Sequence, residues 1–233
     1  DEDGNMIVRI GHSPDPDDAF MFYAMTTNAF PTPGYKFVHE LQDIETLNHR
    51  AIRKELEVSA VSIHAYPNIA NDYALMNCGA SMGEGYGPMI VAKKGTTIED
   101  AKGSPIAVPG LKTSAYMGIK LCWGDLNYEV VPFDEIIPRI MDGTYLSGLI
   151  IHEGQLTYSD YDLDVLVNLG IWWNEKTGGL PMPLGGNVVR RDLGKKVMEE
   201  ITMYTKMSIE YSITNPELAL QFAKKWGRGI DDE

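Results

Sequence analysis

Short apolar runs alternate with stretches of helical spacing along most of the chain. The apolar runs are rich in valine and isoleucine and end at glycine, proline or polar residues, a pattern typical of buried strands. Strands are predicted at residues 6–10, 35–40, 58–63, 88–92, 105–108, 128–131, 147–151, 165–168 and 186–190. Helices are predicted at residues 19–25, 43–57, 65–70, 96–102, 115–121, 134–142 and 217–226, with more helix after residue 192. Strand and helix therefore alternate as far as residue 192, where a helical tail begins.

The alternation predicts an α/β fold with largely parallel sheets. Because the helical tail breaks it, we expect two α/β lobes, with the chain crossing near residues 88–95 and returning near residues 183–190. Lobe 1 is then discontinuous and consists of residues 1–92 and 187–233, and lobe 2 consists of residues 93–186. Ligands of such folds lie beyond the carboxyl ends of the strands, so the strand-to-helix turns are the places where a site is expected.

Two local patterns refine the element boundaries. Asp17 or Asp18 is the predicted N-cap of the first helix, because a short acidic side chain can accept hydrogen bonds from the first helical amides. Trp172 and Trp173 are predicted to open an aromatic loop and to pack in the core.

The charge of the chain excludes several classes of protein. Its 233 residues carry 33 acidic and 20 basic side chains, which gives a formal charge of −13. Nucleic-acid binders need a basic face and polybasic membrane-surface proteins need clustered Lys and Arg, so we expect neither partner. The chain has no apolar run of about 18 residues and begins without the apolar segment of a secretory signal, so a cytoplasmic location is predicted.

The cysteines and histidines give no metal or disulfide signature. Cys78 and Cys122 lie far apart in the sequence and form no CxxC pair, so we interpret them as two small buried hydrophobic residues. The five histidines show neither HxxxH nor HExxH spacing, and no metal site is predicted.

Two strand-to-helix turns in the first lobe carry serines. The first turn, residues 12–18, reads His-Ser-Pro-Asp-Pro-Asp-Asp and is either a plain turn with a helix cap or a turn that places Ser13 and helix amides at a pocket. Ser62 lies near the end of the strand at residues 58–63 and has the same two interpretations, a core or capping serine or a site residue.

The turn at residues 110–115, Gly-Leu-Lys-Thr-Ser-Ala, has the features of an anion cradle. A glycine, the hydroxyls of Thr113 and Ser114 and the amides of a following helix can hold a carboxylate. The spacing is not that of a P-loop, and the glycine-rich loop at residues 79–87 lacks the strand-to-helix context of a dinucleotide site. No nucleotide cofactor is therefore predicted.

The turn at residues 148–153, Gly-Leu-Ile-Ile-His-Glu, ends an apolar strand in His152 and Glu153. An imidazole titrates near neutral pH, so His152 is a candidate general base, with a structural histidine as the alternative. No GxSxG motif is present, so a serine nucleophile is not supported.

Together these turns resemble the 1,4-dihydroxy-6-naphthoate synthase family of the futalosine route to menaquinone. The resemblance covers nearly the whole chain, and its most specific parts are the first Ser-Pro turn and the Leu-Ile-Ile-His-Glu element. The matching stretches are residues 13–23, 43–48, 108–110, 113–116, 148–153, 170–173, 180–185 and 190–193.

The resemblance implies a type II periplasmic-binding-protein-like fold with two lobes around a cleft. It also implies a lyase-type enzyme without cofactor that converts cyclic dehypoxanthine futalosine, a small anionic carboxylate substrate, to 1,4-dihydroxy-6-naphthoate. His152 would be the general base. The expected substrate-binding residues are Asn48, Ser62, Ser114 and Ala115 from the resemblance, together with Ser13, Thr113 and Glu153 from the turns. A homodimer is one possible assembly.

The chain departs from the family in the first turn, where Asp15 and Asp17 stand in place of the usual Cys and Asn. The added carboxylates either face solvent as caps or mark a different substrate. Two other functions remain open: a solute-binding protein of the same fold without chemistry, and chorismate dehydratase, a neighbouring enzyme of the same pathway and fold. A histidine at a strand end and the Leu-Ile-Ile-His-Glu element favour the synthase over both.

Overall fold

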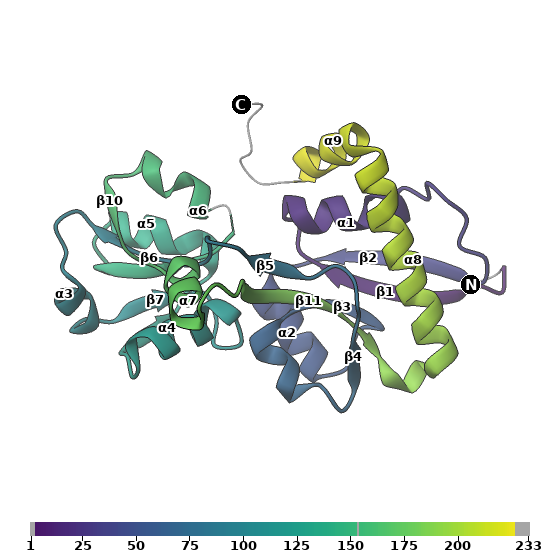
Figure 1. Ribbon diagram of the computed structural model, residues 1–233, viewed down its shortest axis with the longest axis horizontal. Coiled ribbons are helices and arrows are strands. Elements are labelled where there is room, and N and C mark those ends of the chain that lie inside the picture. The colour runs from purple at the N-terminus through teal and green to yellow at the C-terminus, as the bar shows by residue number, and fades with distance from the viewer. Residues whose placement is uncertain (1–2, 153, 227–233) are drawn as a thin grey trace. The chain divides into compact units, whose positions relative to one another are not determined.

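The chain forms two compact units, each built around its own sheet (Figure 1). The computed structural model describes residues 3–152 and 154–226. One unit consists of Asp1–Ala80 and Gly185–Glu233, and the other of Ser81–Leu184. Residues 81–92, which were expected in lobe 1, therefore belong to the second unit.

The first unit is a sheet covered by helices on both faces. Its strand order is β2-β1-β3-β11-β4, and a further strand, β5, pairs with β11. The strands are β1 (Met6–His12), β2 (Tyr35–Leu41), β3 (Val58–Ser62), β4 (Tyr73–Leu75) and β11 (Met182–Arg190), while β5 (Ser81–Gly83) lies just past the boundary, in the residues assigned to the second unit. The helices are α1 (Pro16–Thr26), α2 (Ile44–Ile52), α8 (Lys195–Thr214) and α9 (Pro216–Trp226), with 3₁₀ turns at Ile63–Asn68 and Arg191–Leu193.

Two apolar clusters hold these layers together. On one face, Phe22 of α1 and Ile201 of α8 pack against Val8 and Val58 of the sheet. On the other face, Leu47 of α2 packs with residues of β3 and the segment before it. The sheet is therefore buried on both sides, which accounts for the continuous apolar runs of its strands.

The second unit has a sheet of order β10-β6-β9-β7-β8. Its strands are β6 (Met89–Lys93), β7 (Ile106–Val108), β8 (Tyr128–Val130), β9 (Ser147–Ile150) and β10 (Leu163–Asn168). Its helices are α3 (Ile98–Lys102), α4 (Ser114–Trp123), α5 (Ile136–Met141), α6 (Gly154–Thr157) and α7 (Leu169–Thr177), with 3₁₀ turns at Phe133–Glu135 and Tyr158–Asp160. One core cluster lies under α4 and α7 and another under α5, again on opposite faces.

Every predicted strand is present, and the α/β class is confirmed, but the sheets are mixed rather than largely parallel. In the first sheet β1 runs parallel to β2 and β3, whereas β11 runs antiparallel to β3 and β4. In the second sheet β7 runs parallel to β8 and β9, whereas β6 runs antiparallel to β9 and β10. Two parallel neighbours must be joined by a crossover connection, usually a helix. Within the described part of the chain, no single crossover of this kind joins β6 to β9 or β10, or β11 to β3 or β4.

The predicted aromatic loop at Trp172 and Trp173 is wrong, because both residues lie in helix α7. Asn168 caps this helix by accepting hydrogen bonds from the amides of Gly170 and Ile171. Both tryptophans pack against the core cluster under α4 and α7, as predicted, and the Trp173 Nε1–H donates to the Pro181 carbonyl at 3.1 Å.

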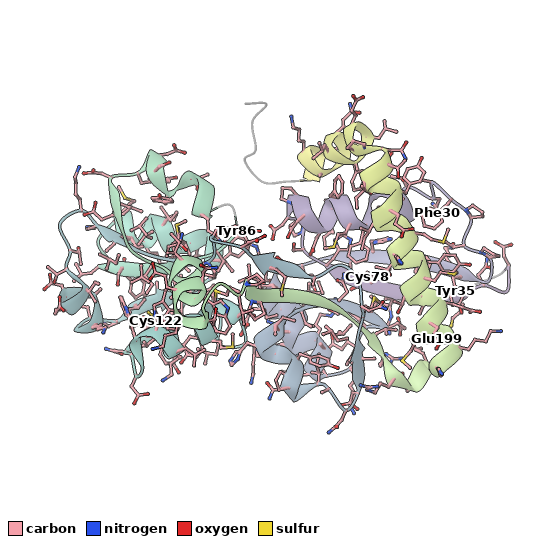
Figure 2. The ribbon with its side chains drawn as sticks, viewed as in Figure 1. Phe30, Tyr35, Cys78, Tyr86, Cys122 and Glu199 are labelled. Atoms are coloured by element: carbon pink, nitrogen blue, oxygen red, sulfur yellow. The ribbon has the colours of Figure 1, made fainter. Side chains whose placement is uncertain are left out.

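Two further expectations concern single elements. The helix predicted at residues 43–57 ends at Ile52, where Arg53 caps it and Lys54 adopts a left-handed φ of 59°. Cys78 packs against the core of the first unit and Cys122 against that of the second, each half-buried, and both are free thiols (Figure 2).

Within the described ranges, none of the helices combines the length and apolarity needed to cross a bilayer.

Candidate functional site

Ser13 and Ser62 lie at the same edge of the first sheet. Strands β1 and β3 are parallel neighbours, with Gly11 opposite Ser59, so their carboxyl ends lie at the same edge of the sheet. Ser13 directly follows β1, and Ser62 is the last residue of β3. The structure thus brings these two predicted site residues to one carboxyl edge, where α/β folds bind ligands.

The first turn is built differently from the prediction. The N-cap of α1 is Asp15, followed by Pro16 at the first helical position, so the caps predicted at Asp17 and Asp18 are wrong. Proline fits the first helical position because its missing N–H would have no acceptor there. Asp18 lies one turn inward, and its carboxylate accepts a hydrogen bond from the Ser13 amide at 2.8 Å.

The acidic residues of this turn differ in how far they are exposed to solvent. Asp15 and Asp18 are buried, whereas Asp17 is exposed and its carboxylate accepts the Asp18 amide at 3.0 Å. Burial, reinforced by the negative charge of Asp17, raises the pKa of Asp18 to about 7, although hydrogen bonds from Ser13 oppose the shift. Of the two departures from the family pattern, only Asp17 therefore faces solvent.

Asn48 and Ser62 form a reciprocal pair. Asn48 lies on α2 with no exposed surface. Its Oδ1 accepts the Ser62 amide at 2.8 Å, and its Nδ2 donates to the Ser62 Oγ at 2.9 Å. Because the Ser62 hydroxyl accepts from Asn48, its own proton is directed toward another acceptor. Asn48 therefore sets the orientation in which Ser62 can donate to a ligand.

A second group of predicted residues lies at one edge of the second sheet. Strands β7 and β9 are parallel neighbours, with Ala107 opposite Gly148. The turn that contains residues 113–115 follows β7, and His152 follows β9. Both therefore lie at the carboxyl edge of this sheet.

The start of α4 has an anion-binding arrangement, although its hydroxyls are engaged. Thr113 is the N-cap: its Oγ1 accepts the Tyr116 amide at 3.1 Å and donates to the Gly110 carbonyl at 2.7 Å. The Ser114 Oγ donates to the Leu184 carbonyl at 2.6 Å. The first amides of a helix point out of its N-terminus, where the positive end of the helix dipole lies. These amides are thus the groups suited to a carboxylate.

His152 adopts an unusual backbone conformation. Its φ is 54°, a left-handed value that few non-glycine residues adopt. The side chain is half-buried, and its ring meets the edge of Phe133 at a centroid distance of 5.3 Å. Its carbonyl accepts the Gln155 amide at 3.0 Å, which helps to hold the turn. Glu153, the neighbouring predicted residue, lies outside the described residues.

The comparison with known proteins decides the family. A family model described as menaquinone biosynthesis matches residues 8–232. The chain is 35% identical to the 1,4-dihydroxy-6-naphthoate synthase of Thermus thermophilus over 97% of its own length and 82% of that enzyme. The chain belongs to this family. A 1,4-dihydroxy-6-naphthoate synthase from Streptomyces coelicolor is 32% identical over 96% of the chain and 80% of that enzyme. The chain is therefore an enzyme of menaquinone biosynthesis.

Solved structures confirm the fold of this family member. A crystal structure of a protein from Archaeoglobus fulgidus is 45% identical, with a TM-score of 0.90 over 97% of this chain and 83% of that one. The alkanesulfonate-binding protein of Xanthomonas axonopodis pv. citri, bound to MOPS, has a TM-score of 0.70 at 12% identity over 94% of this chain and 78% of that one. The latter likeness shows a periplasmic-binding-protein-like fold.

Sequence reasoning missed the buried histidine pair behind the first turn. Nε2 of His12 and Nδ1 of His39 are in hydrogen-bond contact at 3.2 Å. Burial lowers the pKa of His12 to about 4, and burial together with His12 lowers that of His39 to about 3, so both are neutral at pH 7. The alternation in β2, which places His39 on the same face of the sheet as Tyr35 and Phe37, was the available signal. No three His, Cys, Asp or Glu side chains among the described residues gather to hold a metal ion.

Proposed function

We propose that this enzyme converts cyclic dehypoxanthine futalosine to 1,4-dihydroxy-6-naphthoate, with His152 as the general base. The observation that carries the assignment is the left-handed backbone of His152 at the end of a buried strand in a member of this family. Residues other than glycine rarely adopt this backbone conformation, and those that do are concentrated at functional sites. The conformation supports a role for the imidazole beyond packing.

The chemistry requires a proton to be removed next to a carbonyl. A neutral imidazole nitrogen of His152 takes that proton, and the electron pair of the broken C–H bond enters the ring system as it becomes aromatic. As the new ring double bond forms, the bond to the sugar-derived fragment breaks and its electron pair leaves with the fragment, which takes up the proton from the His152 imidazolium so that the base is regenerated. Neither change consumes an oxidant or a metal-bound group, so the proposal needs only the base and groups that hold the substrate.

The substrate carboxylate needs hydrogen-bond donors rather than a large positive charge. The amides at the start of α4, at Ser114 and Ala115, and the hydroxyl of Ser62 are donors of this kind. We assign Thr113 and Asn48 to substrate binding through the hydrogen bonds that orient these donors. Ser13 completes the set in our proposal, while the role of Glu153 stays a prediction.

His152→Asn provides a sharp test of the base. Asparagine tolerates a left-handed backbone, so this variant removes the imidazole without straining the turn. We expect kcat to fall by about 10³-fold or more, while the thermal unfolding midpoint shifts little. The measurement is formation of 1,4-dihydroxy-6-naphthoate from cyclic dehypoxanthine futalosine, followed by liquid chromatography.

His49→Asn is the matched control, because its side chain is half exposed on α2 and pairs with Glu45 on the helix surface. It should retain wild-type turnover. A folded His152→Asn variant that retained turnover would refute the role of His152. Release of 3-enolpyruvylbenzoate from chorismate by the wild type would instead show that the enzyme is a chorismate dehydratase. A cytoplasmic location and a homodimer remain predictions.

A further inference from the structure

Buried side chains hold Ser13 from both sides. The Ser13 amide donates to the Asp18 carboxylate at 2.8 Å, and the Ser13 carbonyl lies 2.9 Å from Nδ1 of His12. The Ser13 Oγ accepts the Asp15 amide at 3.2 Å. Ser13 and the three residues that contact it are each less than a tenth exposed. Its position is therefore fixed by contacts that water cannot replace.

The hydrogen bonds determine which nitrogen of each imidazole carries the proton. A carbonyl oxygen only accepts, so Nδ1 of His12 must donate to Ser13 and must be protonated. A neutral His12 then has an unprotonated Nε2, which faces Nδ1 of His39 at 3.2 Å. His39 must therefore donate through its own Nδ1. Both rings are fixed as the Nδ1–H tautomer.

The surroundings keep the pair neutral and stationary. Phe22 of α1 stacks on His12 with ring centroids 4.6 Å apart and an angle of 20°. The Nε2 of His39 is buried and has no hydrogen-bond partner among the described residues. A proton arriving there would create a buried cation without an acceptor, which is costly. The arrangement thus favours one neutral state of two histidines.

We propose that His39 and His12 are positioning residues that, together with Asp18, hold Ser13 in the orientation that the substrate requires. His39 acts on His12, His12 acts on the Ser13 carbonyl, and Asp18 acts on the Ser13 amide. None of the three needs to touch the substrate. The inference rests on the proposed function, because it takes Ser13 as a substrate-binding residue.

Substitutions at His39 test this series of contacts, because His39 touches His12 and reaches Ser13 only through it. His39→Leu removes the donor to His12 at similar volume, whereas His39→Asn places an amide N–H near the position of Nδ1 and serves as the conservative rescue. We expect His39→Leu to raise KM about tenfold with kcat within about twofold of wild type, because a positioning group acts on binding. His39→Asn should restore KM to within about threefold of wild type.

Nuclear magnetic resonance of ¹⁵N-labelled protein provides a readout that general destabilisation would not change. In the wild type, His12 should show a protonated Nδ1 and an unprotonated Nε2 at pH 7. In His39→Leu the two nitrogen resonances of His12 should move toward each other as the second tautomer becomes populated. His39→Asn should retain the wild-type pattern.

The outcomes separate this inference from the proposed function. Wild-type kinetics in a folded His39→Leu variant, or an Nε2–H tautomer of His12 in the wild type, would overturn the positioning role. If the wild type shows the fixed tautomer but does not convert cyclic dehypoxanthine futalosine, the proposed function fails. The role in substrate binding then fails too, whereas the hydrogen-bonded clamp on Ser13 stands.

Discussion

Three buried titratable residues near Ser13 respond to pH in opposite directions. The pKa values of His12 and His39 fall to about 4 and about 3, below the ordinary histidine value of 6.5. Unfolding lets both histidines take up protons below pH 6.5, so their contribution to stability is lost as the pH falls toward 4. Asp18 behaves in the opposite way, because its pKa rises from 3.8 to about 7. Its contribution is present below pH 3.8 and is lost as the pH rises through 7.

Asp18→Asn separates the carboxyl from the histidines. The amide retains an oxygen that can accept the Ser13 amide but does not ionise. The variant should therefore gain stability relative to wild type as the pH rises from 4 to 8, by up to about 4 kcal/mol for a pKa shift of this size. Urea unfolding at a series of pH values measures this difference.

Asp160→Asn, at an exposed position of the second unit, serves as the control for the loss of one carboxylate. Its pH series shows how much of any difference comes from removing one surface carboxylate. A constant difference between Asp18→Asn and wild type from pH 4 to 8 would show that Asp18 titrates normally in the folded protein.

At the residue scale, the sequence predicts which residues are polar at strand ends but not how they are paired. Ser13, Ser62 and His152 were identifiable because each follows an apolar run. The partnership of Asn48 with Ser62 joins residues 14 positions apart through the pairing of α2 with β3. Such contacts depend on tertiary packing, which local patterns do not encode.

At the scale of elements, α8 is attached to α1 by two buried serines. The Ser208 Oγ donates to the Met21 carbonyl at 2.8 Å, and the Ser212 Oγ donates to the Phe20 carbonyl at 2.7 Å. Both serines are fully buried and lie one helical turn apart. Because α1 begins at the turn of Ser13, this attachment also supports the candidate site.

The double variant Ser208→Ala and Ser212→Ala should lower the free energy of unfolding by about 3 kcal/mol, because three buried interhelical hydrogen bonds are lost. Ser208 makes two of them, since its Oγ also accepts the Met25 amide at 3.3 Å, and Ser212 makes one. Thr214→Ala is the control on the same helix, since within the part of the chain that the structure describes its exposed hydroxyl bonds only to the Glu210 carbonyl of α8. That change should leave stability within about 0.5 kcal/mol of wild type. Urea unfolding at pH 7 measures both variants. A double variant as stable as wild type would show that the two serines do not stabilise the packing of α8 on α1.

Helices and strands were predictable where the periodicity or the apolar character was strong. The prediction failed where a helix cap outweighed the composition of the segment. The nine residues of α7 include glycine, isoleucine and two tryptophans, which are moderate or poor helix formers. Asn168 nevertheless starts a helix there by accepting two amide hydrogen bonds, and apolar packing holds it. Strand direction was beyond local patterns, because it depends on the path of the chain between strands.

At the scale of the whole molecule, the net charge opposes the proposed substrate. A formal charge of −13 repels a carboxylate at long range, whereas the helix amides of α4 attract it only at short range. Salt screens the long-range repulsion more than the short-range hydrogen bonds, since the Debye length is about 10 Å at 0.1 M. Substrate capture should therefore improve as salt is added.

We expect kcat/KM for cyclic dehypoxanthine futalosine to rise about two- to threefold between 10 and 200 mM sodium chloride. The matched variant carries Asp160→Lys and Glu199→Lys at exposed positions, which changes the formal charge by +4, from −13 to −9. Its kcat/KM should exceed that of wild type at 10 mM salt and should rise less steeply. A kcat/KM that fell with salt in both proteins would mean that a local positive field governs capture. In that case basic side chains near the substrate, rather than helix amides and serine hydroxyls, would bind the carboxylate.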